Sequence, residues 1–307
     1  MPPCGHMRDC GRNYSLADVN ASASSSHVYS GESMSTMKQA LARKHEQSRK
    51  QCLRQDGQLA SGGWCLSSDN ATLVELPSGG SYRIPEHHVH ADKLVVLGVA
   101  ALLTDQLLEG VTKCGRHQSV SDIGAGVGQV GHALHALQSS LHFRGYDGAG
   151  NVEEYTDGFI SFVDLTMPLS LPRSDWVTSF EVGEHIPAHD ESMFIRNLHA
   201  LNCRGVVVSW AALKQAGFGH VNNHDPQYVR SVFEGLGYRY SAAISMAIRN
   251  GSGLPPSLRE GSPLLRTVRY TTTPRGRAWW FRHASLQAFE RITPSTSPGC
   301  KPCPTHA

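Results

Sequence analysis

A glycine-rich stretch at residues 119–131 constrains the fold of this chain more than any other sequence feature. It reads Ser-Val-Ser-Asp-Ile-Gly-Ala-Gly-Val-Gly-Gln-Val-Gly, so a short run with apolar positions leads into four closely spaced glycines. Residues 130–137 then place apolar side chains at helical spacing. The stretch therefore predicts a strand, a tight turn that needs glycine, and a helix whose first N–H groups face a ligand.

Two classes of ligand fit such a turn. Residues 126–131 satisfy Gly-x-Gly-x-x-Gly, the pattern of a dinucleotide-binding turn. The glycines begin earlier, however, at Gly124, two residues after Asp122. An acidic residue followed by Gly-x-Gly-x-Gly resembles motif I of the class I S-adenosylmethionine-dependent methyltransferases. The turn alone does not decide between a dinucleotide and S-adenosylmethionine, so residues further along the chain are needed.

The rest of the chain alternates strand-like and helix-like patterns. Strands are expected at residues 120–123, 141–146, 160–163, 176–180 and 205–210, and helices at 92–109, 193–201 and 226–236. This alternation predicts an α/β fold with a parallel sheet and right-handed crossovers. Residues 238–248 and 284–292 are expected to be two final strands with an antiparallel end, because no clear helix pattern separates them.

Each of the first four expected strands ends in a carboxylate: Asp122, Asp147, Asp164 and Glu181. In an open parallel sheet, ligands bind beyond the carboxyl ends of the strands, beside the switch in strand order. The four acids are therefore expected around one site. A sulfonium cation with ribose hydroxyls and an adenine amino group suits carboxylates, whereas a pyrophosphate does not. The acids thus favour S-adenosylmethionine over a nicotinamide dinucleotide.

Over residues 93–292 the chain is similar to the class I methyltransferase family. The resemblance implies a Rossmann-like, mostly parallel seven-stranded sheet, with helices on both faces and an antiparallel C-terminal strand. It also implies S-adenosyl-L-methionine as the cofactor. The cofactor-binding residues that it implies are Asp122, Gly124, Gly126, Gly128, Asp147, Asp164, Leu165 and Glu181.

Three of these residues have specific roles in the family. By resemblance, Asp147 accepts hydrogen bonds from both ribose hydroxyls, Asp164 meets the adenine amino group, and Leu165 lies beside the adenine ring. The chain departs from the family after Asp147, where many members have a residue that packs on adenine. Here residues 148–151 read Gly-Ala-Gly-Asn, which leaves the adenine contacts of this loop open.

Glu184 and His185, just after the fourth strand, are the expected catalytic residues. A neutral oxygen or nitrogen nucleophile can need a general base, and these two side chains have the right location. A purely structural, hydrogen-bonded His185 is the alternative. No metal site is expected, either from His185 with His189 or from the three histidines within residues 87–90. The loop at 217–224 is expected to be a lid over the substrate or an ordinary surface loop.

The sequence narrows the acceptor without identifying it. A net charge of +2, no basic block and no Asn-Pro-Pro-Tyr motif after the fourth strand make nucleic acid an unlikely acceptor. A small-molecule acceptor is favoured and a protein acceptor is possible. The longest apolar run, residues 94–103, is too short to span a membrane. Two alternatives remain open: an NAD-binding oxidoreductase and a catalytically inactive Rossmann-like binding module.

Composition shifts divide the chain into four parts. Residues 1–60 are expected to be a disordered N-terminal extension, 61–92 a small β-hairpin or cap, 93–292 the methyltransferase domain, and 293–307 a disordered tail. The eight cysteines are scattered and no apolar signal segment begins the chain, so they are expected to be reduced thiols of an intracellular, cytoplasmic protein.

Overall fold

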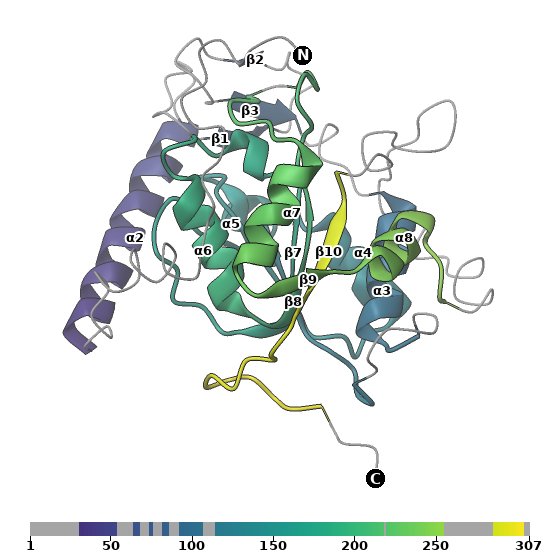
Figure 1. Ribbon diagram of the computed structural model, residues 1–307. Helices are drawn as coiled ribbons and strands as arrows, with labels where there is room; N and C mark the ends of the chain where they lie inside the picture. The colour runs from purple at the N-terminus through teal and green to yellow at the C-terminus, as the bar shows by residue number, and fades with distance from the viewer. Residues whose placement is uncertain are drawn as a thin grey trace.

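The structure, a computed structural model, forms two β-sheets and a set of helices packed around the larger sheet (Figure 1). It describes residues 31–53, 64–67, 74–75, 82–85, 92–106, 114–217, 219–254 and 285–303. Within these residues no helix is both long enough and apolar enough to cross a membrane.

The larger sheet has the strand order β6-β5-β4-β7-β8-β10-β9. Its strands are β4 (Val120–Ile123), β5 (Phe143–Asp147), β6 (Ile160–Phe162), β7 (Ser174–Phe180), β8 (Asn202–Ser209), β9 (Tyr238–Tyr240) and β10 (Gln287–Arg291). Strands β4 to β8 run parallel, whereas β10 is antiparallel to both of its neighbours. The order reverses between β4 and β7, which is where an open sheet of this kind binds its ligand. The predicted fold class is confirmed.

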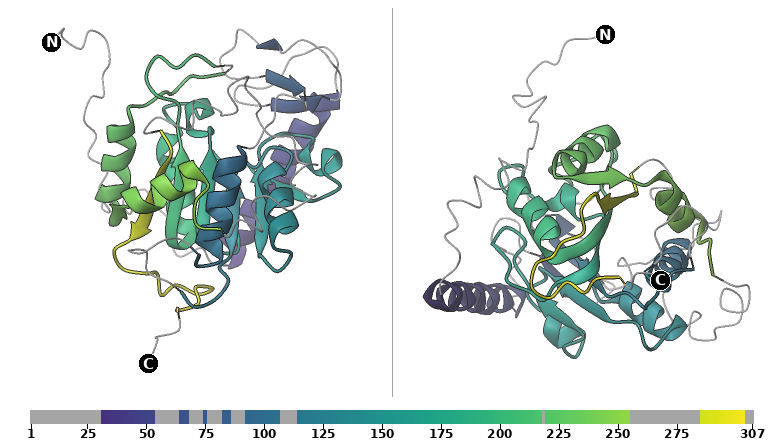
Figure 2. Two further views of the ribbon diagram at one scale, coloured as in Figure 1. Left: turned by 90° about the vertical axis from the view of Figure 1, so that its right-hand side faces the viewer. Right: turned by 60° about the horizontal axis from the view of Figure 1, so that its bottom comes forward.

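Helices cover both faces of this sheet (Figures 1 and 2). One face packs against α3 (Lys93–Leu103), α4 (Gln129–Leu137) and α8 (Ala242–Asn250). The other packs against α6 (Glu191–Leu201) and α7 (Pro226–Gly235). A short helix, α5 (Val152–Tyr155), lies beside β6 at the edge. Each face buries its own apolar cluster, so the sheet is a rigid platform for the loops at its edge.

Helix α3 begins where the sequence predicts. The Asp92 carboxylate accepts hydrogen bonds from the backbone N–H groups of Leu94 at 2.8 Å and Val95 at 3.2 Å, which makes it the N-cap. The helix ends at Leu103 rather than near residue 109.

The prediction of one strand over residues 238–248 is wrong. Strand β9 ends at Tyr240, and α8 begins after Ser241, whose side chain accepts from the N–H of Ile244. Ile244 and Ile248, four residues apart, turn toward α3, where Gly98 leaves no room for a Cβ against the Ile248 backbone. Tertiary packing against α3 thus selects a helix for residues that are as apolar as a strand.

The N-terminal segment also differs from its prediction. Residues 31–53, expected to be disordered or solvated, form helix α2 (Gly31–Leu53) beside the domain. The His45 ring stacks on Phe162 at 4.3 Å, and the Lys44 Nζ lies 3.4 Å from the Asp164 carboxylate. A Cβ at Gly150 would lie 2.6 Å from the backbone of Ser48, so the helix and the loop after β5 are in close contact.

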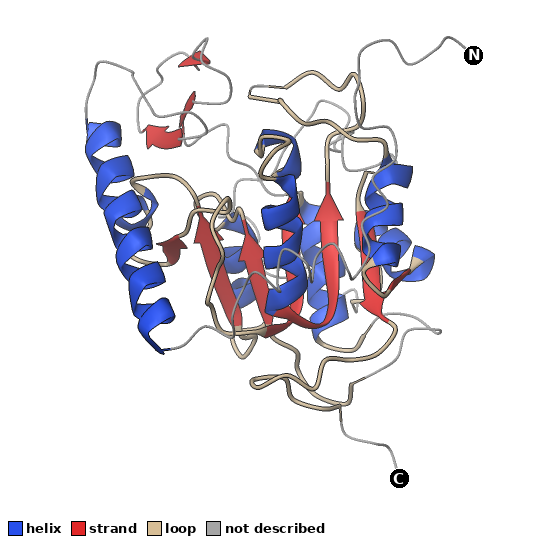
Figure 3. Ribbon diagram, turned by 60° about the vertical axis from the view of Figure 1, so that its left-hand side comes forward, coloured by secondary structure: helices blue, strands red, loops and turns tan. Residues whose placement is uncertain are grey.

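Residues 61–92 contain the second sheet, with strands β1 (Trp64–Ser67), β2 (Val74–Glu75) and β3 (Tyr82–Pro85). Its order is β1-β3-β2: β2 and β3 pair antiparallel, as expected for a hairpin, and β1 adds to β3 as a parallel strand. Figure 3 shows this small sheet near the end of the main sheet to which the strand arrows point. We call residues 31–53 and 64–67, helix α2 and strand β1, the N-terminal cap.

The expectation of reduced cysteines is wrong for six of the eight. Three disulfides join Cys52 to Cys65, Cys114 to Cys303, and Cys203 to Cys300. The last two fasten residues 300–303 to the domain, so this part of the expected disordered tail is anchored. Stable disulfides form in oxidising surroundings, so the cysteines no longer support an intracellular location.

Several predictions lie outside the described residues. These are the disorder of residues 1–30, the histidines at 87–90, residues 255–284 with their aromatic run at 279–281, and residues 304–307.

Candidate active site at the carboxyl ends of the strands

The glycine turn after β4 has the backbone that its sequence predicts. Gly124, Gly126 and Gly128 have φ angles of 83°, 58° and 80°, a region that side chains with a Cβ rarely adopt. The N–H groups of Gly124 and Ala125 donate to the carbonyl of Tyr146 at 2.8 and 2.9 Å, and Gly128 is the N-cap of α4. The turn is therefore held against the end of β5 by its own backbone donors.

Asp147, the last residue of β5, is tied directly to this turn. Its carboxylate accepts one hydrogen bond from the N–H of Gly126 and another from the N–H of Ala149, both at 2.8 Å. The side chain is 2% exposed, and burial raises its pKa to about 7 against the effect of these hydrogen bonds. Each oxygen keeps a second lone pair, so the carboxylate can still accept from a ligand hydroxyl.

Asp122, in β4, lies beneath the turn. The Thr178 hydroxyl of the neighbouring strand donates to its carboxylate at 2.7 Å, and the side chain is 2% exposed. Burial raises the pKa of Asp122 to about 7, and its charge also raises the pKa of Asp147. The two acids thus lie close enough to interact, as the sequence predicts for residues of one site.

Replacing Asp122 should flatten the pH dependence of stability. The folded protein keeps the Asp122 proton up to about pH 7, whereas the unfolded chain releases it near the ordinary pKa of about 4. The folded state binds more protons between these values, so this group's contribution to stability falls as pH rises. When the pH rises from 5 to 8, the free energy of unfolding should therefore fall by about 2 kcal/mol less in Asp122→Asn than in the native chain.

Urea unfolding at several pH values measures this difference. The control is Asp157→Asn, an exposed carboxyl at a φ of 50° that asparagine tolerates. Parallel stability curves for the native chain and Asp122→Asn would contradict the raised pKa.

Asp164 and Leu165 follow β6, the neighbour of β5. The Asp164 carboxylate accepts from the backbone and hydroxyl of Thr166, at 2.9 and 2.6 Å, and pairs with Lys44 of α2. Leu165 is 7% exposed and packs in the apolar cluster that also contains Tyr146. Both lie at the predicted edge, while their contacts with adenine stay a prediction.

The N-terminal cap supplies a residue that the sequence analysis did not assign. Strand β1 pairs with the loop after β5 through the bridge between Trp64 and Ala149, and the N–H of Gly150 donates to the Trp64 carbonyl at 3.1 Å. A Cβ at Gly148 would lie 3.8 Å from the Trp64 indole nitrogen. An aromatic ring from the cap therefore borders the Gly-Ala-Gly loop after Asp147.

A second group of side chains follows β7. Glu181 has a φ of 53° and donates its N–H to the Ser209 hydroxyl at 2.9 Å, which turns the chain at the end of the strand. The 3-10 helix η2 (Gly183–His185) comes next and carries Glu184, whose side chain is fully buried. This segment touches the glycine turn, because a Cβ at Gly124 would lie 2.3 Å from a Val182 methyl group.

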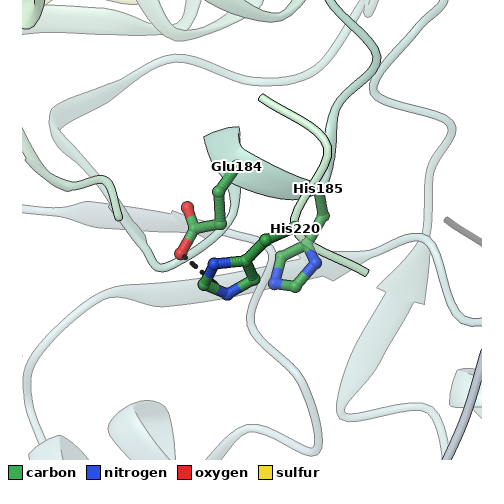
Figure 4. Close-up of side chains that lie close together, drawn as sticks. All are labelled: Glu184, His185 and His220. Carbon is green, nitrogen blue, oxygen red and sulfur yellow. Dashed lines mark ion pairs between the residues drawn. The ribbon is translucent and has the colours of Figure 1, made fainter. Parts of the chain in front are cut away.

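The structure brings His185 together with His220 rather than with His189. The His185 and His220 rings meet edge to face at 5.1 Å, and the His220 Nε2 lies 4.0 Å from a Glu184 oxygen (Figure 4). Burial lowers the pKa of His185 to about 4, and the nearby His220 ring contributes a smaller part of this lowering. The His189 side chain is 80% exposed and lies beside Asp190. His220 is 35 positions from His185, and no local spacing could have indicated it.

The loop that carries His220 is held by its own hydrogen bonds. The carbonyl of Glu184 accepts from the N–H groups of Val221 and Asn222, and the Trp210 indole donates to the Asn222 carbonyl at 2.7 Å. The Asn222 side chain donates to Glu191 of α6 at 2.8 Å. These hydrogen bonds place His220 beside Glu184, while a lid role for the loop stays a prediction.

Two features together decide the fold: the switch between β4 and β7, and an antiparallel β10 inserted between β8 and β9. This is the class I methyltransferase fold. In this methyltransferase fold the glycine turn, the acid after β5 and the η2 segment all lie at the carboxyl edge of the parallel strands.

No protein-family model and no curated protein matches the sequence, whereas some solved structures are similar to this chain. One solved match is the magnesium protoporphyrin IX methyltransferase ChlM from Synechocystis PCC 6803 with bound SAH, at 20% identity and a TM-score of 0.36, covering 48% of this chain and 74% of that one. Another is the plantazolicin methyltransferase BpumL in complex with a triazolic desmethylPZN analog and SAH, at 12% identity and a TM-score of 0.40. It covers 64% of this chain and 84% of that one. A third is the O-methyltransferase NcsB1 from neocarzinostatin biosynthesis with SAH and 1,4-dihydroxy-2-naphthoic acid, at 17% identity and a TM-score of 0.34, covering 47% of this chain and 48% of that one.

Proposed function

We propose that this protein is an S-adenosylmethionine-dependent methyltransferase acting on an oxygen or nitrogen nucleophile, with a small-molecule acceptor favoured. The observation that carries the proposal is the pair formed by Gly126 and Asp147. A glycine turn that is bonded to a buried carboxylate at the switch point lets the methionine end of the cofactor approach the backbone closely and provides acceptors for its ribose. Asp164 and the Trp64 indole are then assigned to adenine.

The η2 segment supports a place for the acceptor. The sulfonium of the cofactor is already an activated methyl donor, so the protein has to hold a nucleophile in line with the S–CH3 bond. Such positioning can supply about 7–11 kcal/mol. Glu184 and His185 directly follow the segment in which Val182 contacts Gly124 of the glycine turn. The neutral imidazole of His185 can take the proton that the acceptor loses. We assign these two residues to the acceptor side of the reaction.

The alternatives differ in what the protein should bind. An NAD-binding oxidoreductase would also use an acid about 20 residues after the glycine turn for its ribose, so Asp147 fits both classes. It would leave the acids Asp164 and Glu181 without a role, and this disfavours it. An inactive binding module would bind the cofactor without turnover.

Thermal shift and calorimetry with adenosylhomocysteine and NADH separate these classes. We expect adenosylhomocysteine to raise the melting temperature and NADH to have no effect. Incubation with methyl-labelled S-adenosylmethionine and a pool of small metabolites then tests turnover. Stabilisation by NADH alone would refute the proposal, and cofactor binding with no labelled product from metabolite, protein or nucleic-acid pools would favour the inactive module.

A further inference from the structure

The cluster formed by Glu184, His185 and His220 has features that the proposed methyl transfer does not require. One donor atom from each residue, a carboxylate oxygen and two imidazole nitrogens, lies within 4.8 Å of the other two. Figure 4 shows the three side chains converging from η2 and from the loop after β8. One carboxylate with two imidazoles is a donor set that first-row divalent metal ions prefer.

The carboxylate of Glu184 is buried beside the His220 imidazole, whose Nε2 lies 4.0 Å from one of its oxygens. The Glu184 side chain is fully buried, and neither of its oxygens has a hydrogen-bond partner among the residues that the structure describes. Glu181 adds a third buried oxygen without such a partner. Buried charges of one sign are costly unless a cation or a proton compensates them, so this site is suited to an added positive charge.

Both histidines are oriented as metal ligands usually are. The His185 Nδ1 lies 3.2 Å from the carbonyl of Gly219, and the His220 Nδ1 lies 3.2 Å from the carbonyl of Gln215. A carbonyl can only accept, so each Nδ1 carries the proton and each Nε2 carries the lone pair. A backbone carbonyl that fixes the ring through its second nitrogen is the usual support of a metal-binding histidine.

The surroundings hold this geometry without a ligand. Gly217 packs so closely on the His220 ring that a Cβ there would lie 2.1 Å from the Nε2. The loop is bonded back to the Glu184 carbonyl through Val221 and Asn222. The cluster also adjoins the glycine turn, because Val182, between Glu181 and Gly183, contacts Gly124. An ion at this place would lie on the acceptor side of the cofactor site.

We propose that Glu184, His185 and His220 bind one divalent first-row transition-metal ion, with Glu181 able to join as a fourth ligand. Its role as an acceptor site rests on the proposed function. The ion would bind the acceptor hydroxyl and make it more acidic. The hydroxyl proton passes to water, the oxygen forms a bond to the methyl carbon, and the S–CH3 electron pair returns to sulfur. Glu184 and His185 then act as ligands, and no protein base is needed.

Metal titration of the full chain tests this proposal without any cofactor. After treatment with EDTA and removal of the chelator, Zn²⁺ and Mn²⁺ are titrated calorimetrically, and Co²⁺ is followed by its visible absorption. We expect one ion per chain at this cluster. Glu184→Gln and His220→Asn should each weaken binding at least about 100-fold, because each removes one of three protein ligands. His189→Ala removes an exposed histidine of the same segment and should bind metal as the native chain does.

Two further measurements keep the outcomes distinct. Circular dichroism and adenosylhomocysteine affinity report whether Glu184→Gln and His220→Asn still fold and form the cofactor site. The proposal is overturned if the native chain binds no stoichiometric metal, or if both variants bind it as tightly as the native chain. Metal binding without adenosylhomocysteine binding would uphold the metal site and refute the methyltransferase function. Adenosylhomocysteine binding without metal binding would refute the metal site and uphold the cofactor site, and His185 would then be the candidate base.

Discussion

Asp147→Asn should weaken adenosylhomocysteine binding at least about 100-fold. A carboxylate that accepts from two ribose hydroxyls makes two charge-assisted hydrogen bonds, each worth about 1.5–3 kcal/mol. The amide replaces one acceptor with a donor and removes the charge. Calorimetry is best done at pH 8.5, because the pKa of Asp147 is about 7 and the carboxyl is ionised above it.

A ligand analogue separates this role from a structural one. Asp147 also holds the N–H groups of Gly126 and Ala149, so its replacement disturbs the turn as well. A 2′,3′-dideoxyribose analogue of adenosylhomocysteine lacks the hydroxyls and should bind the native chain and the variant with similar affinity. If the replacement weakens the binding of both ligands by the same factor, Asp147 supports the loop and does not bind the ribose.

Removing the two disulfides of the C-terminal segment should cost at least about 3 kcal/mol of stability. The Cys203–Cys300 bond closes a loop of 97 residues, and Cys114–Cys303 closes one of 189. Cross-links across long loops restrict the unfolded chain most. The variant Cys300→Ala/Cys303→Ala leaves the buried partners Cys114 and Cys203 as small apolar thiols, and urea unfolding without reductant measures the loss.

The same experiment has an internal control. Reductant should destabilise the native chain strongly and the double variant less, because the variant retains only the Cys52–Cys65 bond of the three. Alkylation of the unfolded, unreduced native chain should leave the six paired cysteines unlabelled. Labelling of all six before reduction would contradict the pairing.

Local sequence signals predicted the parts of this fold that depend on neighbouring residues. The glycine turn requires positive φ angles, the Asp92 cap begins α3, and the buried run in β8 belongs to a central strand. These features determine the sheet and place Asp122 and Asp147 at one edge. Residues 238–248 were misassigned, although Ser241 as a cap and the spacing of Ile244 and Ile248 could have indicated a helix.

Features that depend on distant residues could not be predicted. His220 reaches Glu184 only because the loop after β8 folds back on η2. Cysteine spacing does not determine which thiols pair, since six cysteines alone allow 15 connectivities. Helix α2 has a weakly apolar face, and its docking depends on pairs such as Lys44 with Asp164 that arise only in the folded chain.

The contacts of the N-terminal cap determine which residues a fragment of this protein has to include. Strand β1 is paired with the loop after Asp147, and the Cys52–Cys65 bond fastens α2 to that strand. A truncated chain starting at Lys93 would retain every helix and strand of the main sheet, yet Asp164 would lose Lys44 and Phe162 would lose the ring stacked on it. Fragments made for crystallisation or screening should therefore start ahead of Gly31, since shorter ones would lose the helix and strand that contact the loop after β5.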